Sequence, residues 1–409
     1  MQDFVVDTRE KLLERIGQAG RVVICGADQR GIVLGGLMKE AGAQLICYAV
    51  NGKIPRPTLR GVPVMPISAV ADKDVLALIA ADEAEQMPAY GMLRALGFDN
   101  VAAISDSLYR ALRGQVPVYL DFMCPGFAKC GTTTLQEVLK HNKSAFLPPA
   151  KETFFLQWYK QEGSTRVLRD RHYNNVRPGQ KVGDIDPSHY NRARDAYEYF
   201  GGDLKLVFML RNPADAEFSL FKMMNRFVYR PKYVEYYKRH GKFGQAMFMD
   251  YVSRELCAGK GGRRFEYARW IDEYLKYYPR ENVKIVLMED MLKKPTETMN
   301  GIQEFLGLDV MRFETLPRAN EGKKVSRGWR SARVNLWVFG IDEYRKSRMN
   351  TLPMILFRKV LKPLIFAFTL VDNDEKISPE ARRAVMDHYM PSIHRLEEIM
   401  GRSLEGVWY

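Results

Sequence analysis

The 409-residue sequence is poor in cysteine, and none of its cysteines stand at metal-ligand spacing. No CxxC pair occurs, so neither a zinc site nor a disulfide framework is indicated. The first residues, MQDFVVDTREKLLERIG, lack the apolar core of a secretory signal. We therefore expect a protein of the reducing cytoplasm. The five cysteines are Cys25, Cys47, Cys124, Cys130 and Cys257.

A long hydrophobic run is also lacking. The most apolar segment, residues 349–371 (MNTLPMILFRKVLKPLIFAFTLV), is interrupted by Arg358, Lys359 and Lys362. A helix that spans a bilayer needs about 20 apolar residues, so the sequence excludes a transmembrane segment here. Two interpretations stay open. The segment is either a peripheral contact with the inner membrane surface, which suits mixed basic and apolar side chains, or a helix packed on its own domain.

Acidic residues are outnumbered, with 49 Asp and Glu against 62 Lys and Arg and a formal charge of +13. This excess favours an anionic partner such as a nucleotide, an acidic glycan or a membrane surface. No nucleic-acid-binding module and no compact basic helix are recognisable in the sequence. We therefore expect no nucleic-acid partner.

About the first hundred residues alternate between strand and helix patterns, which is typical of a parallel sheet. The strands RVVIC and AQLICYAV are separated by a glycine turn and a helix over about residues 32–41. A glycine and a proline at residues 113–117 mark a join. We predict a Rossmann-like domain over residues 1–113 and a second domain over residues 114–409. The first half resembles the small Rossmann-like domains at the front of sugar-modifying enzymes.

The dinucleotide-binding fingerprint of this first half is incomplete. Gly26, Asp28 and Gly31 stand at the positions of GxGxxG, and the carboxylate of Asp28 would repel a pyrophosphate. Asn51 stands where an acidic residue would bind a ribose. The sequence therefore favours a structural or partner-docking role over a bound nucleotide.

The second half begins with an apolar strand, VPVYLDFM, and the loop GFAKCGTTTL at residues 126–135. A helix beginning near Thr132 would point its first N–H groups and its dipole at an anion in this loop. Thr132, Thr133 and Thr134 add hydroxyl donors, and Lys129 adds a point charge. The pattern predicts a cradle for phosphate or sulfate.

The loop lacks the residue order of an ATP-binding P-loop. In GxxxxGK[ST] the lysine follows the second glycine, and the hydroxyl binds magnesium. Here Lys129 precedes Gly131, and no GK[ST] occurs in this region. A metal-dependent NTPase is therefore disfavoured.

The order K-x-G-T-[ST]-[ST]-L is similar to the 5′-phosphosulfate loop of sulfotransferases that use 3′-phosphoadenosine 5′-phosphosulfate (PAPS). A second element agrees, because the strand LKLVFML ends at Arg211 and Ser219 follows on the next helix. An arginine and a serine placed in this way can converge on one phosphate, and in that family the pair grips the 3′-phosphate. The resemblance implies PAPS as the cofactor, 3′,5′-adenosine bisphosphate as the product, and no metal. The loop and strand-end residues that it assigns to the cofactor are Lys129, Cys130, Gly131, Thr132, Thr133, Thr134, Arg211 and Ser219.

Further stretches between residues 116 and 409 resemble the same family. PPAKETFFL is similar to the KE-x-x-FF segment of carbohydrate sulfotransferases, in which the glutamate is the base, and this implies Glu152. His189 competes for that role, because some sulfotransferases use histidine. The run VKIVLMEDMLKKPTETMNGIQEFLGL and the C-terminal stretch ISPEARRAVMDHYMPSIHRLEEIMGRSLEGVW also fit the family.

Two stretches depart from the family pattern. A lysine expected in a GEKTPxY-like segment is replaced by Ile185 in VGDIDPSHY. The loop that clasps the cofactor near the C-terminal end is matched only loosely by NEGKKVSRG. Its Lys323 and Lys324 could reach the adenosine phosphates or belong to a solvated basic loop.

The resemblance implies an α/β fold in which the Rossmann-like domain precedes a P-loop-like sulfotransferase domain with a central parallel sheet flanked by helices. It implies in-line sulfuryl transfer, with Lys129 stabilising the charge that develops. We expect the acceptor to be a carbohydrate hydroxyl, on a polysaccharide or a lipid-linked glycan. Two alternatives stay open, a non-catalytic protein that binds anionic glycans and a nucleotide-dependent kinase.

Overall fold

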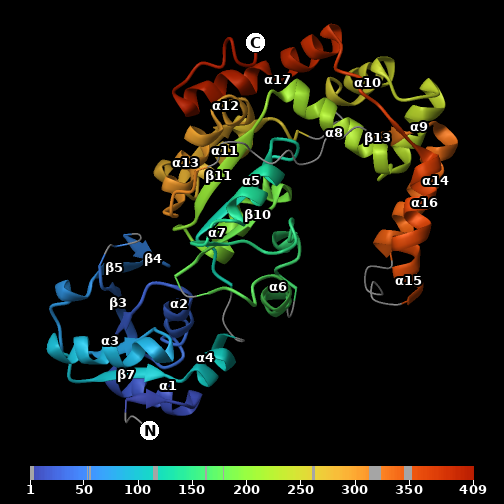
Figure 1. Ribbon diagram of the computed structural model, residues 1–409. Coiled ribbons are helices and arrows are strands. Elements are labelled where there is room, and N and C mark those ends of the chain that lie inside the picture. The colour runs from blue at the N-terminus through green and yellow to red at the C-terminus, as the bar shows by residue number, and fades with distance from the viewer. Residues whose placement is uncertain are drawn as a thin grey trace.

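The computed structural model of the chain is drawn in Figure 1, and most of its helices and strands lie around two larger sheets, with a third sheet of two strands, β13 and β14. The structure describes residues 4–52, 54, 57–113, 118–161, 164–177, 179–259, 263–312, 324–344 and 352–409. Both larger sheets are mainly parallel and flanked by helices, as the α/β expectation required.

The first sheet has seven strands in the order β1-β7-β6-β2-β3-β5-β4, and only the β4–β5 pair is antiparallel. Its side chains alternate between two apolar clusters. Val22 and Ile24 of β2 face one cluster, and Val23 faces the other. Burial on both faces is expected of a parallel sheet covered by helices. The strands are β1 (Val5–Val6), β2 (Arg21–Cys25), β3 (Gln44–Val50), β4 (Thr58–Leu59), β5 (Val62–Pro66), β6 (Leu76–Ile79) and β7 (Val101–Ile104).

Helices α1 (Arg9–Ala19), α2 (Gln29–Gly35), α3 (Glu83–Ala95) and α4 (Asp106–Arg113) accompany this sheet. The limits of α1 follow from its sequence. The Thr8 side chain accepts a hydrogen bond from the Lys11 N–H, and Gly20 ends the helix in the left-handed conformation. Leu12 and Ile16, one turn apart, are fully buried. Helix α2 begins and ends several residues earlier than the sequence patterns indicated.

The second sheet is fully parallel and has the order β12-β11-β8-β10-β9. The expected strands over Lys181–Ile185, 204–210 and 283–289 are present with nearly the same limits. Strand β8 lies later than expected and runs to Gly126, because an irregularity in its pairing with β11 brings Phe208 opposite Gly126. The strands are β8 (Phe122–Gly126), β9 (Ala145–Phe146), β10 (Lys181–Ile185), β11 (Lys205–Leu210) and β12 (Val283–Leu287).

Helices surround the second sheet, and the segment after the C-terminal helix is joined to the start of α8. Ser378 caps the start of α17, and the Asn212 side chain donates a 2.9 Å hydrogen bond to the Trp408 carbonyl. This bond ties the C-terminus to the start of α8. The helices are α5 (Thr132–Leu139), α6 (Ser164–His172), α7 (Ala193–Phe200), α8 (Pro213–Phe227), α9 (Pro231–His240), α10 (Gln245–Tyr251), α11 (Tyr267–Leu275), α12 (Met288–Lys293), α13 (Pro295–Leu306) and α17 (Pro379–Met400).

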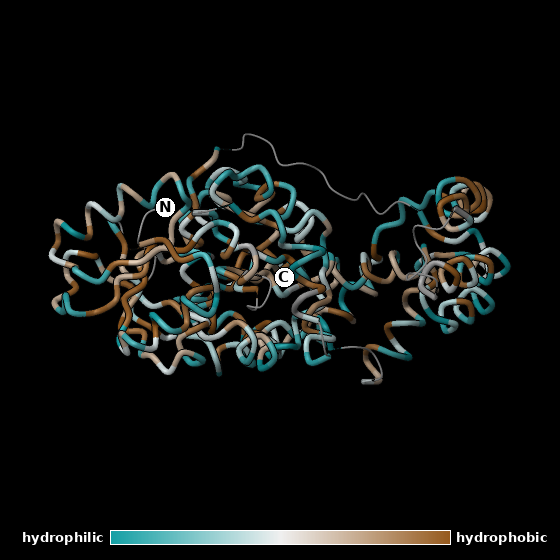
Figure 2. Tube along the Cα trace, turned by 90° about the horizontal axis from the view of Figure 1, so that it is seen from below, coloured by the Kyte–Doolittle hydropathy of each residue, from teal (hydrophilic) through white to brown (hydrophobic). Residues whose placement is uncertain are grey.

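A helical arm extends from this second group of elements, on the side away from the first sheet (Figure 1). Seen from below, it lies at the end of the molecule opposite the N-terminus (Figure 2). Across the described residues, no helix combines the length and the apolar character needed to cross a membrane. The arm consists of α14 (Trp329–Tyr344), α15 (Leu352–Leu356), the π-helical turn η7 (Phe357–Leu361) and α16 (Lys362–Thr369), with β13 (Lys324–Ser326) and β14 (Leu370–Asp372) at its base.

The division of the chain after residue 113 stays a prediction, and residues 114–117 lie outside the described part. The separate apolar clusters support it, although Tyr119 packs with the first group of elements. Contacts join the two halves, since Asp203 accepts hydrogen bonds from the Thr58 hydroxyl and the Gly61 N–H at 2.5 and 3.3 Å.

Candidate active site

The loop between β8 and α5 passes twice through the left-handed region, at Lys129 and at Gly131. Lys129 has φ 68° and Gly131 has φ 88°. A β-carbon at Gly131 would lie 2.9 Å from Met291 Cε, so the position suits glycine alone. Gly131 provides no side-chain cap for α5, and the first N–H groups of the helix therefore face the loop uncapped. We call this loop and the first turn of α5, residues 126–134, the anion cradle.

The cradle forms one wall of a cleft of about 380 Å³. Other walls come from the segment after β9, the end of β11 and the following helix α8, so residues far apart in sequence meet here. The cleft brings together most of the residues that the sequence singled out. These are Lys129, Gly131, Thr132, Thr133, Thr134, Glu152, Arg211 and Ser219.

Positive charge collects in this cleft. Lys129, Lys151 and Arg211 all line it. Within the part of the chain that the structure describes, neither Lys129 nor Arg211 has a carboxylate at ion-pair distance. Burial, together with the nearby charges of Arg211 and Lys151, lowers the pKa of Lys129. An anion in the cleft would relieve this repulsion.

Lys151 connects the cradle to Glu152, and the sequence did not single it out as a site residue. Its Nζ donates hydrogen bonds to Thr132 Oγ1 at 3.1 Å and to Glu152 Oε1 at 3.2 Å. The Lys151 side chain is 18% exposed and that of Glu152 is 37% exposed. The one available signal was its place beside Glu152 in PPAKETFFL.

The backbone that presents Glu152 is strained and held from behind. Glu152 and Phe154 have φ values of 66° and 53°, which L-residues rarely adopt. The Thr153 hydroxyl donates to Asp184 Oδ2 at 2.8 Å, and the Phe154 N–H donates to Asp186 Oδ2 at 2.6 Å. The two aspartates of VGDIDPSHY therefore fix the conformation around Glu152.

Both aspartates are buried, and burial changes the pKa of Asp184. Asp184 is 3% exposed and Asp186 is fully buried. Burial, with the neighbouring charge of Asp186, raises the pKa of Asp184 to about 8. Burial therefore favours the protonated form of Asp184.

His189 lies behind the cleft and is not one of the residues that line it. It is 1% exposed, and burial lowers its pKa. Its Nε2 lies 3.4 Å from Asp186 Oδ2, and its carbonyl accepts a 2.7 Å hydrogen bond from the Tyr274 hydroxyl. Possible ligand atoms of Asp184, Asp186 and His189 lie within 4.8 Å of one another. The expectation that no metal is held stays a prediction.

Three other expected cofactor residues lie outside the cleft or outside the described residues. Cys130 is buried beneath the loop, where its Sγ lies 3.4 Å from the Tyr267 hydroxyl and burial raises its pKa to about 12. Lys324 is exposed on β13 and does not line the cleft. Lys323 lies outside the described residues.

Several cleft residues were not predicted as site residues. Arg264 adds another cation from the segment before α11, and Ser188 of VGDIDPSHY adds a hydroxyl. Met223 and Tyr229 supply apolar wall. Their approach depends on how distant segments pack, which neither periodicity nor motif spacing predicts.

In the first half, the chain's own side chains take the place where a dinucleotide would bind. Asp28 caps α2 by accepting from the N–H groups of Arg30 and Gly31 at 3.0 and 3.2 Å. The Arg30 guanidinium, which is 5% exposed, pairs with Asp82 and Asp106, each at 2.7 Å. Such an internal network at the carboxyl ends of the strands favours a structural role for this half.

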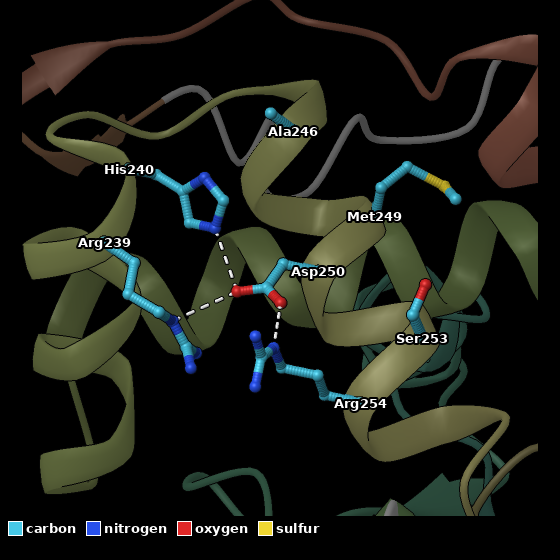
Figure 3. Close-up of a pocket in the computed structure, with 7 residues that line it drawn as sticks. All are labelled: Arg239, His240, Ala246, Met249, Asp250, Ser253 and Arg254. Atoms are coloured by element: carbon cyan, nitrogen blue, oxygen red, sulfur yellow. Dashed lines mark hydrogen bonds and ion pairs between the residues drawn. The ribbon is translucent and has the colours of Figure 1, made fainter.

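A second, more open hollow of about 580 Å³ lies beside α9 and α10 (Figure 3). Its centre is Asp250, which pairs with Arg239 at 3.1 Å, with His240 at 2.9 Å and with Arg254. Burial alone would raise the pKa of Asp250, but hydrogen bonds from His240 and Arg254 hold it below the ordinary value. None of the predicted site residues lies in this hollow.

Comparison with known proteins supports the prediction made for the second half of the chain. Residues 120–318 match the family model described as "Sulfotransferase domain". This match covers just under half of the chain, and it supports sulfuryl transfer as the general chemistry of residues 120–318. The match ends before the C-terminal stretch from residue 377, for which the family resemblance stays a prediction.

No curated protein matches the chain. Among solved structures, a sulfotransferase from Alicyclobacillus acidocaldarius aligns at 18% identity over 71% of this chain and 98% of its own, with a TM-score of 0.46. The sulfotransferase domain of the Synechococcus PCC 7002 olefin synthase aligns at 12% identity over 66% of this chain and 94% of its own, with a TM-score of 0.31. The support for sulfuryl transfer rests on the family model.

Proposed function

We propose that the protein transfers the sulfuryl group of PAPS to a hydroxyl of a carbohydrate acceptor by in-line displacement, with Glu152 as the base. The observation that carries this proposal is the cleft itself. There the anion cradle, Arg211, Ser219 and Glu152 line one cavity although they come from separate segments of the chain.

The chemistry of the cleft fits PAPS. The uncapped N-terminus of α5 and the Lys129 ammonium suit the sulfated 5′ end, and the Arg211 guanidinium with the Ser219 hydroxyl suits the 3′-phosphate. The lowered pKa of Lys129 supports this assignment, because a polyanion would offset the repulsion among the cleft cations. Bound PAPS would supply the sulfuryl group and leave as 3′,5′-adenosine bisphosphate.

Glu152 is suited to receive the acceptor's proton. A carboxylate is too weak a base to ionise a hydroxyl in advance, so Glu152 takes the proton while the new O–S bond forms. Lys129, Lys151 and the N–H groups of α5 stabilise the charge that moves away from the acceptor. Because these groups are fixed before the reaction, the main contributions of the site are alignment and charge stabilisation.

A carbohydrate acceptor, on a polysaccharide or a lipid-linked glycan, is the class that the KE-x-x-FF likeness supports. Phe154, which is 41% exposed and lines the cleft close to Glu152, offers an apolar surface for the C–H face of a sugar ring. A cytoplasmic location stays a prediction from the few cysteines and the amphipathic N-terminal residues.

The test is a screen of possible acceptors with PAPS: polysaccharides, glycolipids, phenols and tyrosine peptides. Transfer is measured by the release of 3′,5′-adenosine bisphosphate and by the increase in the acceptor's mass. We expect transfer to a carbohydrate. Glu152→Gln should lower kcat by about 10²–10⁴-fold, the usual contribution of a positioned base. Glu137→Gln, on the part of α5 that does not line the cleft, is the matched control and should act like wild type.

Three results would contradict parts of the proposal. Transfer to phenols or tyrosine peptides alone would remove the carbohydrate acceptor. Glycan binding without turnover of PAPS would favour the non-catalytic alternative. Dependence on ATP and Mg²⁺ would favour a kinase.

A further inference from the structure

One face of the arm is unusually apolar for an exposed surface. Leu356, Val360, Leu364 and Phe368 recur every fourth residue along α15, η7 and α16, and Leu361 lies beside them. Their exposed fractions run from 46% for Leu361 to 70% for Phe368. We call these five side chains the apolar stripe.

The stripe does not serve the arm's own core. That core is formed by other residues of the same helices, because Met354 and Phe357 are buried against Val338 of α14. Helix α14 adds the exposed Val334 and Trp337, at 40% and 60%. Exposed apolar side chains gathered in this way mark an interaction surface rather than ordinary surface variation.

The sequence around the stripe is strongly basic. Between residues 323 and 371, eleven lysines and arginines stand against two acidic residues, Asp342 and Glu343. Lys359 is exposed and lies between stripe residues in sequence. Within the described part of the arm and its base, Lys324, Arg327, Arg330, Arg333 and Lys359 are exposed, so this surface carries basic as well as apolar side chains.

We propose that this arm docks on a membrane surface that carries anionic lipids. An interfacial helix places its apolar face at the boundary of head groups and acyl chains, while lysines and arginines meet the anionic head groups. The cores of protein interfaces are, in contrast, depleted of lysine. Charge complementarity and the continuous stripe thus favour a bilayer over a protein partner.

The arm is attached beside the cleft by aromatic contacts. Tyr229, which lines the cleft, packs edge-on against Phe339 of α14 with 4.4 Å between ring centroids. Phe227 packs against Phe366 of α16 at 6.0 Å. A docked arm would therefore hold the cleft close to the membrane. The binding proposal itself does not depend on the proposed sulfuryl transfer.

The test is cosedimentation of the full chain with vesicles of phosphatidylcholine alone and of phosphatidylcholine with about one third phosphatidylglycerol. We expect wild type to bind the anionic vesicles and to be released by high salt. Leu364→Glu/Phe368→Glu should bind at least tenfold more weakly, and Lys359→Glu should also lose affinity. Leu292→Glu, which changes a leucine 64% exposed on α12, is the matched control and should bind like wild type.

Wild type that sediments with neither kind of vesicle would overturn the proposal, and so would a stripe variant that binds as well as wild type. Sedimentation velocity tests the alternative that a second copy of the chain binds the stripe. A concentration-dependent dimer that Leu364→Glu/Phe368→Glu abolishes, without vesicle binding by wild type, would assign the stripe to a second copy of the chain. Near-native circular dichroism of the variants ensures that lost binding is not lost folding.

Discussion

The ammonium of Lys151 donates a hydrogen bond to the hydroxyl of Thr132, with 3.1 Å between Nζ and Oγ1. The same Nζ lies 3.2 Å from Glu152 Oε1. One side chain thus joins the first turn of α5 to the proposed base. It also places an ammonium in the cleft of a chain that has Ile185 where the family pattern has a lysine.

Replacing Lys151 by alanine should lower kcat by about 10–100-fold, because hydrogen bonds to charged groups contribute about 1.5–3 kcal/mol. The affinity for 3′,5′-adenosine bisphosphate should change less, because one of the two Lys151 hydrogen bonds orients Glu152, which acts on the acceptor and not on the nucleotide. Steady-state kinetics and calorimetry measure the two effects. Lys140→Ala, at the C-cap of α5, is the control, and equal kcat values for the two variants would contradict the role given to Lys151.

Gly131→Ala should weaken binding of 3′,5′-adenosine bisphosphate by at least tenfold. The new methyl group would meet Met291 Cε at 2.9 Å, and φ 88° is unfavourable for alanine. Gly179→Ala separates these causes, because its φ is 76° and no atom lies within 4 Å of the added carbon. That control should lose about 1–2 kcal/mol of stability and keep its affinity. Equal affinities of Gly131→Ala and Gly179→Ala for 3′,5′-adenosine bisphosphate would contradict the cradle geometry.

His189 and Glu152 compete for the role of base, and the cleft favours Glu152. His189→Asn should lower kcat by less than tenfold, because the ring does not line the cavity. Glu152→Gln should lower it by the full contribution of a general base, about 10²–10⁴-fold. Single-turnover measurements on both variants check this order, and the reverse order would assign the base to His189.

Stability should depend on pH through Asp184. Its pKa is raised to about 8 in the folded protein, above the ordinary value of about 3.9 in the unfolded chain. Between these two values the folded state binds a proton that the unfolded state has released. The free energy of unfolding therefore falls as the pH rises from about 4 to 8.

Urea unfolding across that pH range, on wild type and Asp184→Asn, measures this effect. The variant keeps an acceptor for the Thr153 hydroxyl but has no proton to lose, so its stability should fall less steeply. Glu235→Gln, an exposed carboxylate on α9, shows the background change. Parallel curves for wild type and Asp184→Asn would contradict the raised pKa.

Strands and the start of α5 could be predicted well from the sequence. The largely apolar runs of β11 and β12 are short and bounded by polar residues, so their limits are local properties. The cradle was equally local, because glycines and hydroxyls at fixed spacing determine it. Cofactor and base assignments came from family resemblance, and the structure brings Arg211, Ser219 and Glu152 into one cleft.

What the sequence could not provide depends on tertiary contacts. Arg264 reaches the cleft from the segment before α11, whose Tyr267 packs against Phe127 of the loop with 4.7 Å between ring centroids. The roles of Asp184 and Asp186 follow from hydrogen bonds to Thr153 and Phe154, about thirty residues earlier in the chain. The exposed stripe of the arm was visible in the sequence as an apolar segment, but which of its side chains would be buried was not.

Calorimetric binding of 3′,5′-adenosine bisphosphate tests the central claim most directly. We expect micromolar affinity for wild type and for Lys39→Ala, an exposed lysine of the first half. Lys129→Ala and Arg211→Ala should lose this binding, and ATP should not bind to wild type. Absence of binding by folded wild type, or equal binding by all four proteins, would contradict the assignment of the cleft to PAPS.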